Sequence, residues 1–448
     1  MSMRAQLLLP CLLAFTAQAQ FPLSQPATGD TLYSGTDLLT PVACWPWNGG
    51  ALLPMQANPG TRLVRLADDG TWLGVEALPA AFAHVFGSTD GSPAPVIVGR
   101  TMDQRAYIAR LNSTADGVLW ADSLMVNNET YFSNATVLGN GDLLTCGTSY
   151  VTPMDLRPIV RRYGPGGQLL WTYSLPGQAI TRAVHGREVA DGALIVTGLS
   201  GPATPSAIEV LCMRFSAGGA PEATQTLGVG GFQQGLKVLE RPAGGSMIFG
   251  KQDSPVNGVV LHVDDQCALQ TERYHPGLAV YDVCLDPATD SYYATGHRDG
   301  FCLVARFDDQ GDTLWTRTYA EGIGRHIRPD GHGGFLVSGT AVDSVTGLFL
   351  RPYLLRVDGD GSMVGVVTVG AAAGTAYLLD VDADGGARIH VAAPCRWMLL
   401  DATGRLVDEG RIAQAGRAWI PAPRSKGLVL LQLRDDQGRT EVLRWTRP

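Results

Sequence analysis

A unit of about fifty residues recurs along most of the chain, and no other feature of the sequence restricts the fold as strongly. The first element of the unit is an apolar run with a basic residue before a turn, as in IARLNSTADG and CMRFSAGG. Its anchors, at intervals of 44 to 52 residues, are Arg65, Arg110, Arg162, Arg214, His262, Arg306 and Arg356. The second element is an apolar run that ends in glycine, with a weaker first copy that starts at Ala51. Its glycines are Gly99, Gly147, Gly198, Gly250, Gly296 and Gly339.

Each copy has the pattern of four short strands. The runs are rich in Val, Leu and Ile and lack helical periodicity, and turns such as Asp191-Gly192 supply the positive φ that tight hairpins need. One such sheet cannot bury both of its faces alone, whereas sheets packed around an axis can. We therefore predict an all-β chain with a seven-bladed β-propeller within residues 20–370. Two β-sandwiches would not give near-equal periods. An eighth blade stays open, because MLLDATGRLV near Leu400 loosely resembles a further copy.

Three copies carry a tryptophan shortly after the turn, at Trp120, Trp171 and Trp315. This pattern resembles the repeat of quinoprotein-like propellers, which implies that the indole packs between blades. The chain lacks the adjacent cysteine pair of the quinone dehydrogenases. The run from Asp309 to Thr313 is similar to the Asp-box of sialidase-type propellers, with Leu314 in place of tryptophan. Neither resemblance implies an activity.

The N-terminal residues have the pattern of a secretory signal peptide. Arg4 provides the positive charge, residues 7–15 form a short apolar stretch, and Ala17-Gln18-Ala19 is an A-x-A cleavage signal. We predict removal of residues 1–19. A lipoprotein anchor at Cys11 is disfavoured, since Pro10 precedes it where a small residue is expected. No later segment is apolar enough for a transmembrane helix.

Charge and cysteine content exclude several classes of protein. The net charge is −8, so nothing in the chain would neutralise a run of phosphates, and we expect no nucleic-acid partner. The seven cysteines beyond the predicted signal peptide show no C-x-x-C spacing, which argues against a zinc site or redox motif. We expect buried thiols, with one or two disulfides left open and their pairing not defined by the sequence.

The last 75 or so residues change in character, with alternating apolar strands and tight turns that predict a small β-sandwich over residues 371–448. Three features stand out: DATGRLV from Asp401, GLVLLQL from Gly427, and a closing DQGR turn. They resemble the type A C-terminal sorting domain of proteins exported by the Bacteroidetes type IX secretion system, although Leu428 and Val429 replace its usual tyrosine region. The resemblance implies export by the type IX secretion machinery, followed by release or attachment at the cell surface.

Candidate ligand-binding residues lie at the start of each predicted innermost strand, where a propeller would present them at the mouth of its central channel. These are His84, Asn134, Arg182, Gln234, Asp282, His326 and Tyr377. We place the binding surface on the face with the longer connections, such as residues 148–158. A D-x-D-x-D-G run gives a weak calcium candidate at Asp380, Asp382 and Asp384, but Val391 stands where an EF-hand has glutamate. We expect no other cofactor.

The sequence contains none of the common hydrolase or nucleotide-binding motifs. Two functions follow from the predicted fold. The first is a non-enzymatic binding module, secreted or on the cell surface, for an extracellular protein or glycan. The alternative is a propeller glycoside hydrolase or polysaccharide lyase. Hydrolysis of a glycosidic bond would require two carboxyl groups about 5–10 Å apart in the channel.

Overall fold

The computed structural model describes part of the chain. The described residues are 40–447 except 42, 48–49, 57–60, 67–71, 78–81, 89–93, 116, 153–154, 176–179, 203–207, 229–230, 343–348, 369–375, 382–385, 392–393, 402–404, 415, 422–426 and 436–439. The predicted signal peptide, residues 1–19, lies outside them. The chain divides into two compact units, one ending at Ala373 and the other starting at Gly374, where the sequence placed the boundary after residue 370.

Within the described residues of the first unit, every regular element is a strand, and the strands form seven antiparallel blades. Blade 1 contains β1 (Thr40–Pro41), β2 (Trp45–Trp47), β3 (Gly50–Gln56), β4 (Thr61–Leu66) and β5 (Trp72–Ala77), where β1 and β2 both pair with β3. Blade 2 contains β6 (Phe82–Ser88), β7 (Val96–Thr101), β8 (Ala106–Leu111) and β9 (Val118–Leu124). Blade 3 contains β10 (Glu129–Val137), β11 (Leu143–Thr152), β12 (Asp155–Tyr163) and β13 (Leu169–Ser174).

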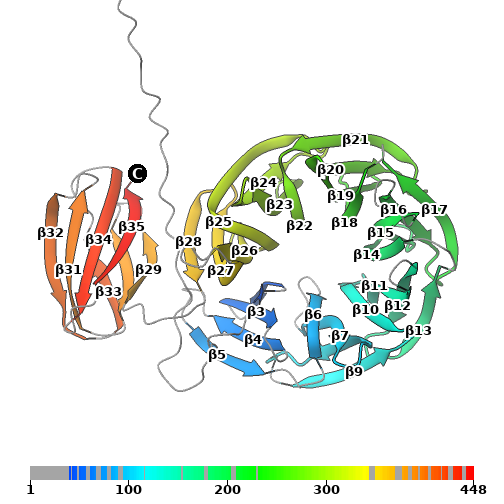
Figure 1. The fold of residues 1–448 in the computed structure, drawn as a ribbon, viewed down its shortest axis with the longest axis horizontal. Helices are drawn as coiled ribbons and strands as arrows, with labels where there is room; N and C mark the ends of the chain where they lie inside the picture. The colour runs from blue at the N-terminus through cyan, green and yellow to red at the C-terminus, as the bar shows by residue number, and fades with distance from the viewer. Residues whose placement is uncertain are drawn as a thin grey trace, which may run out of the picture. The chain divides into compact units, whose positions relative to one another are not determined.

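The remaining blades repeat this order. Blade 4 contains β14 (Ile180–Glu188), β15 (Leu194–Gly201), β16 (Glu209–Phe215) and β17 (Pro221–Leu227). Blade 5 contains β18 (Gln233–Glu240), β19 (Ser246–Asp253), β20 (Val256–Val263) and β21 (Leu269–Pro276). Blades 6 and 7 contain β22 (Ala279–Asp286), β23 (Ser291–Arg298), β24 (Phe301–Phe307), β25 (Thr313–Pro329), β26 (Gly334–Val342), β27 (Phe349–Asp358) and β28 (Met363–Thr368). The prediction of a seven-bladed β-propeller is confirmed (Figure 1).

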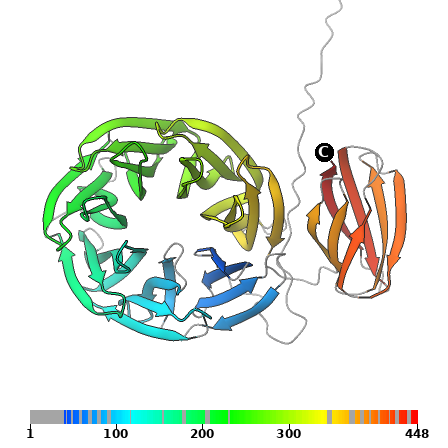
Figure 2. The ribbon, with the colours of Figure 1, turned by 180° about the vertical axis from the view of Figure 1, so that it is seen from behind.

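The first strand of each blade faces the centre of the ring and the last lies at its outer edge (Figures 1 and 2). Strand β25 serves two blades, because residues 313–321 pair with β24 and residues 322–329 pair with β26. Blades 6 and 7 therefore form one seven-stranded sheet. Blade 1 closes the ring by packing β1 against β26 and β27 of blade 7.

The glycine that ends the second recurring element has a structural cause. In blade 4 a Cβ atom on Gly198 would lie 1.9 Å from the carbonyl oxygen of Arg182 on the innermost strand. Gly250 and Gly296 meet the carbonyl oxygens of Gln234 and Ala279 in the same way, at 2.3 and 1.7 Å. In each blade the innermost strand has a β-bulge beside this contact. Glycine is required there because the bulged backbone approaches more closely than any side chain allows.

The recurring arginines join neighbouring blades. Arg162 donates to the carbonyl oxygen of Ala217 at 2.9 Å, and Arg214 donates to that of Asp265 at 2.7 Å. Each acceptor lies in the third-to-fourth strand turn of the next blade. Both guanidinium groups also pair with an aspartate of their own blade. Arg162 and Arg214 therefore hold neighbouring blades together.

The three tryptophans also pack between blades, as predicted. Trp171 stacks on Phe215 of the following blade with ring centroids 6.0 Å apart. A Cβ atom on Gly219, in the turn of that blade, would lie only 2.5 Å from the indole. Trp120 and Gly167 repeat this arrangement one blade earlier. The turn glycines thus give the indole rings room to pack.

The second unit is a small two-sheet β structure. One sheet contains β29 (Ala376–Val381), β30 (Ala387–Val391) and β33 (Gly416–Ile420). The other contains β32 (Leu406–Ile412), β31 (Cys395–Asp401), β34 (Gly427–Asp435) and β35 (Thr440–Arg447). Buried residues from both sheets, including Ile389, Leu399 and Leu431, form the core of the predicted β-sandwich.

Three sequence predictions concern this second unit. The segment that loosely resembled an eighth blade, residues 398–407, covers the end of β31 and the start of β32 in the second unit, with residues 402–404 outside the described residues. Tyr377 lies on β29, so its assignment to the channel mouth was wrong: the sequence repeat ends one strand before it. Asp380 is the last but one residue of β29, whereas Asp382 and Asp384 lie outside the described residues. Elsewhere in the described part of the chain, no group of metal-ligating side chains is present.

Candidate functional site

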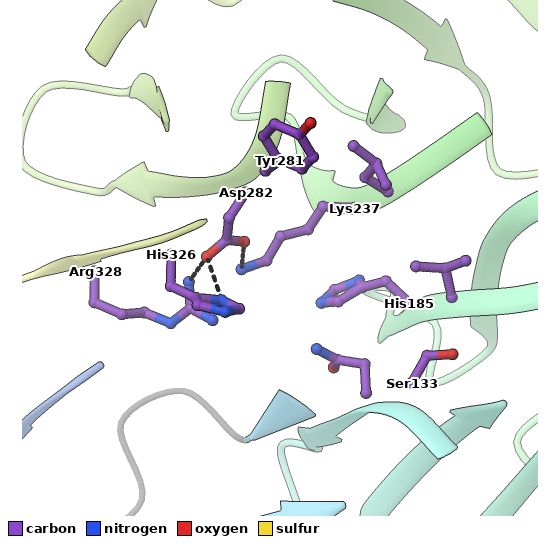
Figure 3. A pocket seen from close by; sticks show the side chains of 10 residues that line it. Ser133, His185, Lys237, Tyr281, Asp282, His326 and Arg328 are labelled. Carbon is purple, nitrogen blue, oxygen red and sulfur yellow. Dashed lines mark hydrogen bonds and ion pairs between the residues drawn. The ribbon is translucent and has the colours of Figure 1, made fainter. Parts of the chain in front are cut away.

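A pocket of about 110 Å³ lies among the innermost strands of blades 3 to 7. It is lined by Ser133, Asn134, Val184, His185, Leu236, Lys237, Tyr281, Asp282, His326 and Arg328. Figure 3 shows these side chains converging from strands far apart in the sequence. The volume suits a few water molecules or one small polar group of a ligand.

The β-bulges supply this lining. Consecutive residues of a regular strand point to opposite faces, but here neighbouring pairs such as Leu236 with Lys237 and Tyr281 with Asp282 both face the pocket. The pairing register shifts between Gly235 and Lys237 in blade 5, and equivalent shifts occur in blades 3, 4, 6 and 7. The inserted residue turns two successive side chains towards the centre of the ring.

Asp282 is the centre of a charge cluster contributed by three blades. Its Oδ1 atom accepts a hydrogen bond from Lys237 Nζ at 3.0 Å. Its Oδ2 atom accepts one from the backbone N–H of Ile327 at 3.1 Å and another from the Arg328 guanidinium. His326 Nδ1 lies 3.7 Å from the same oxygen. Because Lys237, Asp282 and Arg328 are all buried, the cluster fixes the positions of blades 5, 6 and 7 around the pocket.

The cluster controls the protonation of its members. Burial alone would raise the pKa of Asp282, but the charges of Arg328 and Lys237 outweigh burial and hold that pKa well below its ordinary value. Burial lowers the pKa of His326, and the same two cations lower it further against the opposing effect of Asp282. At neutral pH the pocket therefore contains an ionised Asp282 and a neutral His326 imidazole.

His185 adds a second imidazole from blade 4. Its Nδ1 atom accepts a hydrogen bond from the backbone N–H of Val238 at 3.4 Å, which leaves the proton of the neutral ring on Nε2. The side chain is 4% exposed. This contact positions the His185 imidazole of blade 4 against the innermost strand of blade 5.

Tyr281 connects the pocket to a basic rim. The Arg325 guanidinium carbon and Lys251 Nζ lie 5.3 and 5.6 Å from the centroid of its ring. The His297 ring lies 5.9 Å from the same centroid. These distances are within the range of cation–π attraction for the two charged groups, so the aromatic ring holds both cations beside the pocket.

The predicted site residues fall into two groups. Asn134, Asp282 and His326 line the pocket. Arg182 and Gln234 lie on innermost strands but two and three residues before the two lining positions of their blades, and Arg182 donates to the Tyr150 hydroxyl at 3.1 Å. His84 lies on β6 opposite Arg100. The structure therefore brings together three of the seven predicted residues.

The sequence prediction missed His185, Lys237, Tyr281 and Arg328. A signal for the first two exists, since Asn134, His185 and Lys237 each precede the recurring glycine of their blade by thirteen residues. Alignment on that glycine would have selected them instead of Arg182 and Gln234. The loop prediction for residues 148–158 was also mostly wrong, because β11 extends to Thr152 and β12 starts at Asp155.

Comparisons with known proteins bear on the fold. No protein-family model matches the chain, and the comparison with curated proteins gives no match. Among solved structures, Saccharomyces cerevisiae Sqt1 is 10% identical, with a TM-score of 0.47 over 92% of this chain and 97% of that one. The C-terminal WD40 domain of Sif2 is 14% identical, with a TM-score of 0.45 over 86% of this chain and 97% of that one. Puromycin hydrolase is 15% identical, with a TM-score of 0.48 over 86% of this chain and 60% of that one. At these values the similarities indicate nothing about function.

No helix in the described part of the chain has the length and apolarity needed to cross a membrane.

Proposed function

We propose that this chain is an exported binding protein whose propeller receives a ligand at the central pocket, without catalysis. The observation that carries this proposal is the state of Asp282. Its oxygens already accept hydrogen bonds from Lys237, Ile327 and Arg328, and its pKa lies well below the ordinary value. A carboxylate held in this way is a poor proton donor, whereas the surrounding polar side chains form a fixed recognition surface.

Export is supported by the sequence at both ends. The first twenty residues have the charge, apolar stretch and A-x-A signal of a secreted chain. The last 75 or so residues resemble a type IX sorting domain, which would deliver the propeller to the cell surface or the medium. In this proposal the type IX secretion machinery is the partner of the second unit. The partner of the propeller is an extracellular protein or glycan.

Two experiments test these parts. Expression in a bacterium with a type IX system should give a mature N-terminus at Gln20, and removal of residues 371–448 should retain the chain inside the cell. An uncleaved N-terminus or unchanged export of the truncated chain would contradict the delivery proposal. A glycan array probed with the purified full-length chain tests binding, with Asn134→Ala as the variant that should lose the signal, because Asn134 lines the pocket and takes no part in the Asp282 cluster.

The hydrolase alternative gains no support at this pocket. Among the described residues that line it, Asp282 is the single carboxylate, so the pair that glycoside hydrolysis requires is not provided there. A lyase has one specific observation in its favour: the neutral His326 imidazole lies in a pocket with Lys237 and Arg328. Elimination from a uronate needs a base and a cation that stabilises the carboxylate.

The lyase is tested directly. The full-length chain is incubated with polygalacturonate and with a sulfated polyuronate, and the ultraviolet absorbance of unsaturated uronate is followed. An increase that His326→Ala abolishes would establish the lyase and overturn the non-catalytic proposal. Binding without an increase in absorbance would support the proposal of a binding protein.

A further inference from the structure

The rim of the pocket around Tyr281 gathers nitrogen groups from three consecutive blades. Lys251 comes from β19 of blade 5, His297 from β23 of blade 6, and Arg325 from β25 between blades 6 and 7. All three lie within 6 Å of the Tyr281 ring centroid. Since Tyr281 also lines the pocket, the rim and the pocket form one continuous surface.

Two of these groups have hydrogen-bonding capacity that the described residues do not use. The Nε atom of Arg325 and the Nδ1 atom of His297 are both buried and have no hydrogen-bond partner. A buried polar atom without a partner is unfavourable, so a ligand group that accepted a hydrogen bond from either atom would be stabilised. Arg325 is held by its contact with the Tyr281 ring and forms no ion pair with any described carboxylate.

The charges of the rim favour an anion. Lys251 pairs with Asp253 at 2.9 Å, but that carboxylate is half-exposed. Burial, followed by the charges of Lys251 and Arg325, lowers the pKa of His297. The Asp282 carboxylate is engaged by Lys237 and Arg328 inside the pocket. The rim therefore presents two cations and an imidazole against two carboxylates, Asp253 and Asp299, neither of which pairs with Arg325.

We propose that Lys251, His297 and Arg325 bind an oxyanion group of the ligand, a carboxylate, sulfate or phosphate, at the Tyr281 side of the pocket. This inference rests on the proposed binding function and specifies the chemistry of its ligand. The planar guanidinium of Arg325 offers paired donors that match the geometry of an oxyanion. Tyr281 would hold the cations in place, and the neutral part of the ligand would extend into the pocket beside Asn134 and His185.

The test measures binding to the full-length chain by calorimetry. The ligands are sodium sulfate, sodium phosphate, trigalacturonate and the methyl ester of trigalacturonate, which has the same sugar without the charge. We expect an acidic ligand to bind, the ester to bind at least about tenfold more weakly, and affinity to fall with added salt. Arg325→Ala and Lys251→Ala should each weaken binding by about tenfold, and Arg325→Lys by less.

Arg298→Ala is the matched control. Arg298 follows His297 in the same strand and donates to the carbonyl oxygen of Pro276, so its removal changes the same net charge without touching the Tyr281 cluster. Its affinity should equal that of the wild type. An equal loss in Arg298→Ala and Arg325→Ala would overturn the site, because it would show a general effect of charge.

The remaining outcomes separate the two proposals. Tighter binding of trigalacturonate than of the free anions supports a glycan source for the oxyanion, and equal or tighter binding of sulfate or phosphate supports a free anion or headgroup. Equal binding of the acid and its ester, or no binding of any anion, overturns the inference. If a neutral glycan from the array still binds, the proposed function survives that result. If neither the array nor calorimetry detects a ligand, the proposed binding function and the proposed oxyanion site are both overturned.

Discussion

Lys237 and Asp282 lie on neighbouring blades, and their side chains meet at 3.0 Å in the interior of the ring. Only 3% of the Lys237 side chain and 9% of the Asp282 side chain are exposed, so this ion pair is screened little by solvent. Lys237 is one of three lysines among 34 basic residues. An ammonium group is a compact charge on a flexible stem, which suits the narrow space between two bulged strands.

Replacement of Asp282 by asparagine should destabilise the propeller by about 3–5 kcal/mol at pH 7, because Lys237 and Arg328 would lose their buried counter-charge. Denaturant unfolding of the full-length chain measures this. The matched control is Asp155→Asn, which removes the half-exposed pair with Arg157 and should change stability little. Equal effects of the two variants would contradict the structural role of the cluster.

The same cluster predicts how stability depends on pH. The pKa of Asp282 is lower in the folded chain than the ordinary value near 3.9. Its contribution to stability is therefore complete above about pH 4 and is lost as the pH falls towards the folded pKa. In denaturant titrations between about pH 5 and pH 2, the difference in stability between wild type and Asp282→Asn should shrink. A constant difference would show that ionisation of Asp282 is not what stabilises the ring.

Gly198→Ala tests the close approach of the bulged strand. The added Cβ would lie 1.9 Å from the Arg182 carbonyl oxygen, so either the bulge or the strand has to move. We expect a loss of about 3 kcal/mol, at the upper end for overpacked sites. In Gly218→Ala of the same blade, the added Cβ meets no atom closer than 3.8 Å, so the free energy of unfolding should change little. A tolerated Gly198→Ala would mean that the recurring glycine has another cause.

Arg214→Met tests the inter-blade anchors. Arg214 is 5% exposed and donates to Asp265 of the next blade at 2.7 Å. Methionine keeps much of the packing and removes the hydrogen bonds, so we expect a loss of about 2 kcal/mol in unfolding free energy. Arg273→Met removes a half-exposed pair with Asp312 and serves as the comparison. A smaller loss in Arg214→Met than in Arg273→Met would contradict the anchor role.

Cys212 and Cys267 are neighbouring buried thiols, and the structure contains no disulfide between them. The hydrogen bond of the Cys212 thiol to Cys267, together with burial, raises the pKa of Cys212 well above its ordinary value. Both thiols lie in the core shared by blades 4 and 5 and are free. Because the thiolate is the reactive form of cysteine and both thiols are buried, treatment of the folded chain with oxidised glutathione should leave this pair reduced.

Thiol labelling followed by peptide mapping with mass spectrometry measures the reactivity of each cysteine. Cys212 and Cys267 should react only after the chain is unfolded in denaturant. A disulfide between them in the folded chain after the glutathione treatment would contradict this prediction.

The sequence was sufficient for the architecture of the propeller but not for the register of its inner surface. Seven near-equal periods and Asp-Gly or Gly-Gly turns determine the number and size of the blades. The pocket depends on one inserted residue in each innermost strand, such as Val184 or Leu236, and no residue type marks such a bulge. An error of three residues therefore replaced His185 and Lys237 with Arg182 and Gln234.

The rim could not be predicted for a different reason. Lys251, Tyr281, His297 and Arg325 belong to three consecutive blades and come together only when these blades pack side by side. None of them lies in a recognisable motif, and the lysine in particular looks like an isolated surface residue in the sequence. Contacts of this kind depend on tertiary structure, and periodicity along one strand carries no information about them.

Because strand β25 belongs to two blades, the junctions between blades of the propeller should differ in mechanical strength. Blades 6 and 7 are held together by continuous peptide bonds and one hydrogen-bonded ladder. At the junction of the last blade with the first, the contacts include the Cys44 thiol against the Leu336 carbonyl at 3.5 Å and no shared strand among the described residues. Under load or heat the toroid should part at a junction without a shared strand before blades 6 and 7 separate from each other.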